Sequence, residues 1–94
     1  MIEPDPSSPY ELTWEYEAID RLATLVKQYP DAARGVVPAV YRLAVDPWPA
    51  ESTRLGGSGT YRRLPVGYFR VLYAVTEDPP LVRIILVGRD DQAR

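Results

Sequence analysis

The sequence lacks the side chains that most often hold metals in proteins. None of its 94 residues is cysteine and none is histidine, so disulfide bonds and thiolate or imidazole ligands are excluded. Carboxylates are the remaining strong ligands, and they are not the donors that zinc, haem or iron–sulfur clusters use. We therefore expect no metal and no cofactor, and the missing cysteines suit a cytoplasmic protein.

Long hydrophobic runs are missing as well. The longest apolar stretches, such as Val82–Gly88 with Arg83 inside it, fall far short of the ~20 residues that a membrane-spanning helix needs. The first residues are acidic rather than basic, which is not the pattern of an export signal. The sequence thus predicts a soluble chain that does not enter a membrane.

Basic residues are slightly outnumbered by acidic ones and are unevenly placed. The net charge is −2, with four basic and eight acidic residues in 1–50, against seven basic and five acidic residues in 51–94. A weakly acidic protein gains little affinity for nucleic acid from its average field, so such binding would have to come from a local patch. The alternative is that these charges are scattered and merely solvated.

Length and composition predict one small domain. Hydrophobic residues make up 46% of the chain. A domain of this length buries on folding roughly 60–65% of the surface that its unfolded chain exposes. Residues 1–9 contain three prolines, two serines and two acids, which predicts a disordered leader. Residues 10–94 are predicted to form the folded domain.

Hydrophobic periodicity predicts a strand and two helices in the first half. Apolar and polar residues alternate over 10–14, as in a short strand. Apolar side chains at helical spacing predict an amphipathic helix over 15–28, and Asp31 is a candidate N-cap for a second helix that ends before Pro47. Because Pro38 falls inside that second helix, the helix is either kinked or begins with Pro38 in its first turn.

Strand parity predicts a two-faced sheet in the second half. After a loop over 46–59, a two-residue turn at Gly67 and Tyr68 and a reversal at Asp78 and Pro79 would join three antiparallel strands. One face is then apolar and suits a core beneath the helices. The other, termed the open face, would collect Arg63, Pro65, Arg70, Leu72, Ala74, Arg83, Ile85 and Val87, with Arg89 continuing the alternation. The order strand, helix, helix and three strands predicts an α+β fold.

Arginines are the first notable feature of the open face. Arg63, Arg70 and Arg89 are predicted to lie close together, about 5–8 Å apart on adjacent strands. Such a cluster can clamp phosphates or stabilise a pentavalent transition state. The alternative is that these side chains confer solubility or bind an acidic protein. Arg83 lies further along the sheet, where we expect it to be solvated or to face a partner.

Aliphatic side chains are the second notable feature. Leu72, Ile85 and Val87 would form an apolar strip on the open face, which is unusual for an isolated monomer. This strip predicts a docking site for a helix or strand of another chain, unless the protein's own tail or loop covers it. The acidic pair Asp90 and Asp91 is interpreted as terminal charge without a fixed scaffold.

Five segments follow a recognisable family pattern. They are Tyr10–Trp14 (YELTW), Leu43–Pro47 (LAVDP), Leu55–Arg63 (LGGSGTYRR), Val66–Tyr73 (VGYFRVLY) and Leu86–Arg89 (LVGR). Together they resemble the RelE/ParE toxin superfamily of bacterial toxin–antitoxin modules, and VGxxRVLY is the most specific of them. The resemblance implies a compact, microbial-RNase-like fold with two helices on a sheet. It also implies a cognate antitoxin that wraps the toxin, and the strip on the open face is where we expect it.

RelE-like members cut mRNA in the ribosomal A site without a metal, by attack of a 2′-hydroxyl on the neighbouring phosphate. The resemblance implies catalytic roles for Arg63, Arg70 and Arg89. Two family features are missing, since Pro65 stands at the second basic position and no tyrosine follows Arg89. The only lysine lies on the first predicted helix, and arginine is a poor general base. The sequence therefore offers electrostatic stabilisation without an evident base.

Three functions remain open from the sequence. The first is a ribosome-dependent mRNA endoribonuclease that blocks translation, favoured by the three aligned arginines. The second is a ParE-like inhibitor of DNA gyrase that acts by binding. The third is a catalytically degenerate homologue that mainly binds an antitoxin. The acidic net charge and the missing groups count against the first function.

Overall fold

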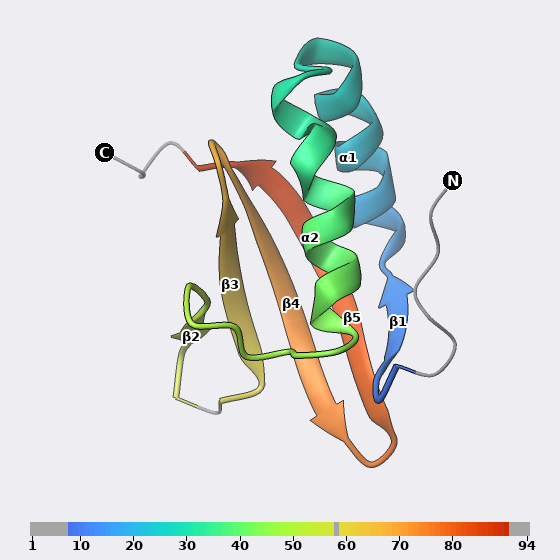
Figure 1. Cartoon of the computed structure of the whole chain (residues 1–94), viewed down its shortest axis with the longest axis vertical. Helices are drawn as coiled ribbons and strands as arrows, with labels where there is room; N and C mark the ends of the chain where they lie inside the picture. Colours follow the sequence, from blue (N-terminus) through green and yellow to red (C-terminus); the bar gives the residue numbers. More distant parts are fainter. Residues whose placement is uncertain (1–7, 58, 91–94) are drawn as a thin grey trace.

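A computed structural model describes residues 8–57 and 59–90, and it contains two α-helices packed on a five-stranded sheet (Figure 1). The elements in chain order are β1 (Glu11–Trp14), α1 (Tyr16–Gln28), the 3₁₀ helix η1 (Ala32–Gly35), α2 (Val36–Leu43), β2 (Thr53–Leu55), β3 (Tyr61–Val66), β4 (Phe69–Glu77) and β5 (Pro80–Arg89). The predicted α+β fold is confirmed. The predicted leader falls mostly outside the described residues, so the boundary at residue 10 stays a prediction.

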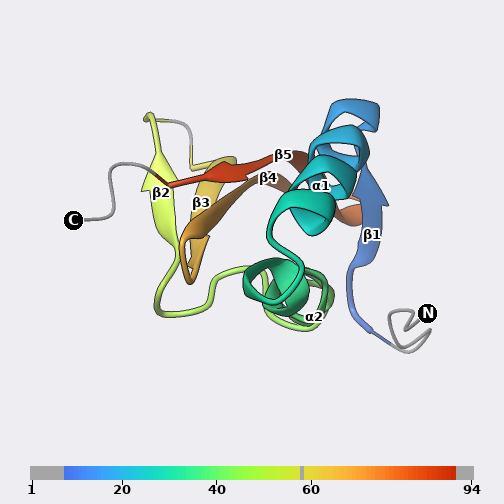
Figure 2. The same cartoon turned by 90° about the horizontal axis from the view of Figure 1, so that it is seen from above.

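The sheet is mixed rather than wholly antiparallel. Its strand order is β1-β5-β4-β3-β2, in which β1 runs parallel to β5 and the other neighbours are antiparallel. The short edge strand β2 forms inside the segment that was predicted to be a loop. In Figure 2, α1 lies along β5 beside β1, and α2 lies next to α1. Residues 8–57 and 59–90 include no helix that is long and apolar enough to cross a membrane.

The position of Pro38 in the second helix shows which of the two predicted arrangements is present, a kinked helix or a proline in the first turn. η1 leads directly into α2, and Pro38 is the third residue of α2, so it lies in the first turn, where its missing N–H costs no helical hydrogen bond. Asp31 occupies the N-cap position of η1, but its side chain makes no capping hydrogen bond. It accepts one from Arg34 at 3.1 Å instead, so the predicted capping interaction is wrong.

Both predicted strand reversals are confirmed. β3 pairs with β4 around Gly67 and Tyr68, and β4 pairs with β5 around Asp78 and Pro79. Gly67 has φ +59°, a left-handed conformation that glycine adopts without steric cost. The turn residues therefore set the register that the alternation of side chains requires.

A β-bulge in β5 changes which side chains face the helices. The register shifts between Leu72 and Tyr73, so two residues of β5, Ile85 and Leu86, lie opposite Leu72. Beyond the bulge the alternation is displaced by one residue, and Val87 is fully buried in the core. The prediction that Val87 lies on the open face is therefore wrong, and Leu86 takes its place.

The covered face of the sheet forms the core with the helices. Its buried side chains are Leu64, Phe69, Val71, Tyr73, Val75, Val82, Ile84 and Val87. The Tyr73 hydroxyl donates a 2.6 Å hydrogen bond to the carbonyl oxygen of Pro47, which ties the loop after α2 to the sheet. Burial raises the pKa of Tyr73 above its usual value, against the lowering effect of Ser52 and Arg62. The phenol therefore stays protonated as a donor.

Candidate functional site

The candidate site lies where the ends of β3, β4 and β5 meet. Arg63 of β3 and Arg70 of β4 both face the carboxylate of Asp90, the residue that follows β5. Nη2 of Arg63 donates to Oδ2 of Asp90, and Nη1 of Arg70 is 3.8 Å from Oδ1. The structure thus brings two of the three predicted arginines together through one carboxylate.

Asp90 is buried, whereas the two arginines remain accessible. The Asp90 side chain is 2% exposed, against 30% for Arg63 and 32% for Arg70. The backbone N–H of Asp90 donates to the carbonyl oxygen of Tyr68 at 2.8 Å, and Nη1 of Arg70 donates to that of Arg89 at 2.9 Å. The interpretation of Asp90 as loose terminal charge is therefore wrong. Position alone gave no sign of this role, and its neighbour in the acidic pair lies outside the described residues.

Arg89 does not take part in the ion pairs of Arg63 and Arg70 with Asp90, although it lies near Arg70. It pairs with the buried Phe69, and its guanidinium lies over the ring of Tyr29, 5.4 Å from the centroid. Nη1 of Arg89 also donates to the Tyr29 hydroxyl at 3.2 Å. The prediction that Arg89 shares the open face with Arg63 and Arg70 is wrong, because the bulge displaces the alternation by one residue before Arg89 is reached.

Arg83 lies on the open face at the β1 side of the sheet. It pairs with Ala74 of β4 and Thr13 of β1, and its Nε is 3.4 Å from Oε2 of Glu15. Both side chains of this ion pair are about half exposed, so the pair contributes little to stability. Its partners place Arg83 apart from the cluster around Asp90.

Leu72 and Ile85 line an apolar hollow of about 350 Å³ on the open face, with Leu55 and Tyr61 on its other walls. Tyr61 is 46% exposed. Both residues of the predicted strip that remain on this face are therefore available to a partner. The hollow is apolar enough for aliphatic or aromatic side chains of another protein.

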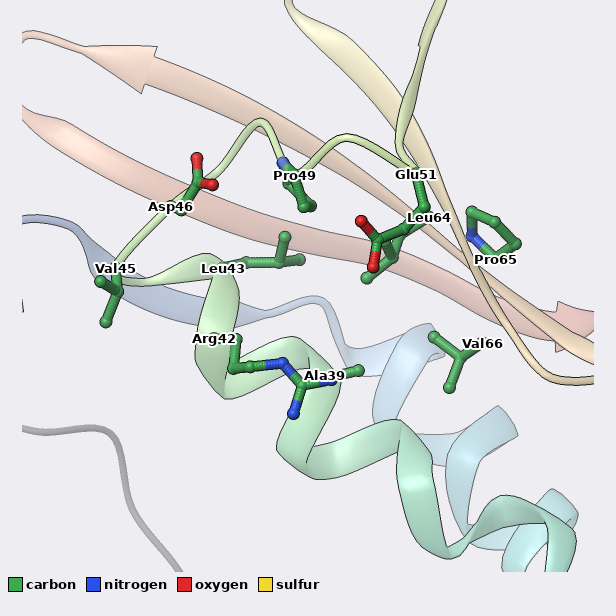
Figure 3. Close-up of a pocket in the computed structure, with 10 residues that line it drawn as sticks. All are labelled: Ala39, Arg42, Leu43, Val45, Asp46, Pro49, Glu51, Leu64, Pro65 and Val66. Carbon is green, nitrogen blue, oxygen red and sulfur yellow. The ribbon is translucent and has the colours of Figure 1, made fainter.

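A larger pocket of about 490 Å³ lies between α2 and β3 (Figure 3). Leu43, Leu64 and Val66 contribute apolar walls, and the charged side chains of the lining are Arg42, Asp46 and Glu51. The pocket is separate from the pair of arginines on Asp90. Its two carboxylates outnumber its single guanidinium, so the lining does not favour an anionic ligand.

The chemistry of the Asp90 cluster is that of an anion site. Each guanidinium has five N–H donors in a planar fork that matches phosphate oxygens, and the carboxylate between them holds both forks in place. In residues 8–57 and 59–90, no three side chains of the kind that bind metals come together. The cluster can therefore orient and neutralise a phosphate.

Scans of the sequence against models of protein families and against curated proteins find no match. Comparison with solved structures does find similar folds. A chain of the archaeal RelE–RelB complex of Pyrococcus horikoshii OT3 has 22% identity and a TM-score of 0.75, over 90% of this chain and 99% of that one. A chain of the RelBE2 toxin–antitoxin complex of Mycobacterium tuberculosis has 22% identity and a TM-score of 0.71, over 86% and 98%.

The toxin RelE of E. coli, solved as a mutant in the free state, has 17% identity and a TM-score of 0.70, over 90% of this chain and 87% of that one. At these identities the likeness establishes the fold. The chain has the fold of RelE-like toxins, as its sequence motifs led us to expect.

Proposed function

We propose that this chain, which has the RelE-like fold, is the toxin of a type II toxin–antitoxin module and cleaves mRNA on the ribosome. The observation that supports this most strongly is the pair Arg63 and Arg70, held together by Asp90 on the face of the sheet that the helices leave uncovered. The similar structures are named as RelE toxins and as toxin–antitoxin complexes.

The Asp90 cluster supplies the charge stabilisation for the proposed reaction, and water supplies the proton acceptor and donor. The 2′-oxygen of a nucleotide forms a bond to the adjacent phosphorus and the bond to the 5′-oxygen breaks, while the 2′-hydroxyl gives its proton to water and the 5′-oxygen takes one from water. Negative charge accumulates on the phosphate oxygens in the transition state, when one bond is forming and the other is breaking. Two fixed guanidinium groups stabilise that charge. Asp90 acts here as a positioning residue, because it orients both forks.

We propose that a cognate antitoxin covers the open face. Among the similar structures, RelE is in complex with RelB, and YafQ is in a toxin–antitoxin complex with DinJ. In this chain the hollow beside Leu72 and Ile85 offers apolar anchoring sites, and buried apolar anchors provide most of the affinity of protein interfaces. An antitoxin seated there would also restrict access to Arg63.

Inhibition of DNA gyrase by binding is the second candidate. It is favoured by Pro65 at the position where a basic residue is expected, and by Asp90, whose negative charge offsets part of the arginine charge. Supercoiling by purified gyrase with added protein measures it. Unchanged supercoiling at micromolar protein would reject this candidate.

Brief induction in growing cells, followed by ribosome profiling, tests the first candidate. The expected result is growth arrest with mRNA breaks inside ribosome-bound codons, and Arg70→Ala should abolish both. Arg34→Ala is the matched control, because Arg34 is exposed on η1 and pairs only with Asp31 among the described residues. Halted growth with intact messages would contradict cleavage. Harmless expression with tight antitoxin binding would indicate a degenerate homologue.

A further inference from the structure

A second cationic feature lies beside the candidate site. It is a groove of about 330 Å³ between α1 and the end of β5. Its lining consists of Arg21, Thr24, Leu25 and Gln28 of α1, Arg70 of β4, and Leu86, Val87, Gly88 and Arg89 of β5. Three arginines from three elements thus converge, with no acidic side chain in the lining. Such a concentration of charge is unexpected in a chain whose net charge is −2.

Arg21 is the arginine of this lining whose side chain forms no ion pair or hydrogen bond with the described residues. It is exposed, and none of the ion pairs or hydrogen bonds within residues 8–57 and 59–90 involves its side chain. Gln28 lies on the same side of α1 and adds an amide donor. Thr24 donates its hydroxyl proton to the carbonyl oxygen of Asp20, which leaves its oxygen facing the groove only as an acceptor. The donors are therefore mainly those of Arg21 and Gln28.

The floor of the groove is kept open by Gly88. Gly88 pairs with Arg70, and a Cβ built on it would meet no atom within 4 Å. Its φ is not in the left-handed region, unlike that of Gly67, so neither the backbone nor the packing requires a glycine here. The effect of the missing side chain is to leave space beside Arg70.

We propose that this groove binds a backbone phosphate of single-stranded RNA, next to the phosphate held by Arg63 and Arg70. Arg70 belongs to both sites, since it faces Asp90 and also lines the groove. Guanidinium and amide donors are among the groups that contact nucleic-acid backbones. The identification of the ligand as RNA rests on the proposed function. The inference that the ligand is an anion depends only on the lining of the groove.

The test is the binding of purified protein to a fluorescent 2′-O-methyl oligoribonucleotide, which cannot be cleaved because it has no free 2′-hydroxyl. Fluorescence anisotropy is followed over a series of salt concentrations. We expect Arg21→Ala to weaken binding at low salt and to reduce the slope of log K against log[salt] by about 0.7, the value for one contact to a single strand. Arg34→Ala removes the same charge from η1, outside the residues that line the groove, and should leave binding unchanged.

Gly88→Val provides a second variant that changes no charge. Valine suits a strand and fills the floor of the groove, so we expect weaker binding from a protein that is still folded. Binding by Arg21→Ala equal to that by Arg34→Ala would overturn the proposal. Binding by Gly88→Val equal to wild type would overturn it as well.

This measurement does not depend on catalysis. If wild type cuts no mRNA in cells, the proposed function fails. The effect of Arg21→Ala on the uncleavable probe still shows whether the groove binds RNA. A parallel titration with a polyglutamate peptide separates RNA from an acidic protein. Weaker peptide binding by Arg21→Ala with unchanged RNA binding would assign the groove to a protein partner and overturn the proposal.

Discussion

Two neighbouring arginines of β3 show how differently the two faces of the sheet are used. Arg62 lies on the covered face, where its Nε and Nη2 donate to the Ser52 hydroxyl oxygen at 3.1 and 2.9 Å. Arg63 lies on the open face and pairs with Asp90 while 30% of its side chain stays exposed. Arg62 fastens the segment before β2 to the sheet, whereas Arg63 keeps donors available. The residue type is the same, and the face determines the role.

The comparison extends to the apolar side chains. The covered face is completed by the protein's own helices and loop, as the full burial of Ile84 and Tyr73 shows. The open face retains a hollow and two arginines that are about one-third exposed, which the described part of the chain does not cover fully. The covered face is therefore packed into the core, whereas the open face keeps part of its side chains accessible.

The largest expected difference is between two adjacent isoleucines. Ile84→Ala should lower the free energy of unfolding by about 2–5 kcal/mol, because it leaves a cavity in the core. Ile85→Ala deletes the same atoms from the open-face hollow and should cost about 1 kcal/mol or less. Urea denaturation of both variants measures the difference. Equal losses would mean that the open face is packed as tightly as the core.

The next test compares the alanine variants of the two arginines. Arg62→Ala should lower the free energy of unfolding by about 1.5–3 kcal/mol, the range for hydrogen bonds from a charged donor, yet leave mRNA cleavage per folded molecule intact. Arg63→Ala should abolish cleavage at a matched concentration of folded protein. Loss of cleavage in the Arg62 variant alone would reverse our assignment of the faces.

The smallest expected effect concerns tyrosines at high pH. Tyr73→Phe removes the bond to Pro47 and should cost about 0.5–1.5 kcal/mol at neutral pH. The pKa of Tyr73 is raised in the folded state, so this contribution is complete below about pH 10, where unfolded tyrosine titrates. It is lost as the pH rises through the folded pKa.

Thermal unfolding between pH 8 and 11 measures this effect as the difference between wild type and the Tyr73 variant. Tyr61→Phe is the control on the open face, since Tyr61 is 46% exposed. A stability difference for Tyr73→Phe that does not shrink above pH 10 would contradict the assigned role of its hydroxyl.

The sequence predicted the hairpin registers because their turn residues are distinctive and the flanking residues alternate clearly. It failed at the bulge because Ile84, Ile85, Leu86 and Val87 are all aliphatic, so alternation gives no sign of which residues face inward. The errors for Val87 and Arg89 follow from that one displaced residue. A β-bulge is a local backbone feature that an apolar run does not encode.

Asp90 was missed for a different reason. An acidic residue after the last strand usually extends into solvent, and its burial depends on two arginines that are distant in sequence and meet it only in the folded sheet. Helix α1 shows a similar limit. Its span was predicted correctly, but Ile19 and Val26 of its apolar stripe are exposed, at 51% and 45%. Periodicity identifies a helix, but it does not show how wide a stripe the sheet can cover.

The interior position of β5 has a consequence for the newly made protein. β5 lies between β1 and β4, so the earliest strand of the domain waits for the latest one before it can pair. Arg63 and Arg70 likewise meet their shared carboxylate only after β5 has joined the sheet. During synthesis, the chain therefore stays incomplete until Pro80–Arg89 has left the ribosomal exit tunnel. The arrangement of Arg63 and Arg70 around Asp90 therefore forms only after β5 has emerged.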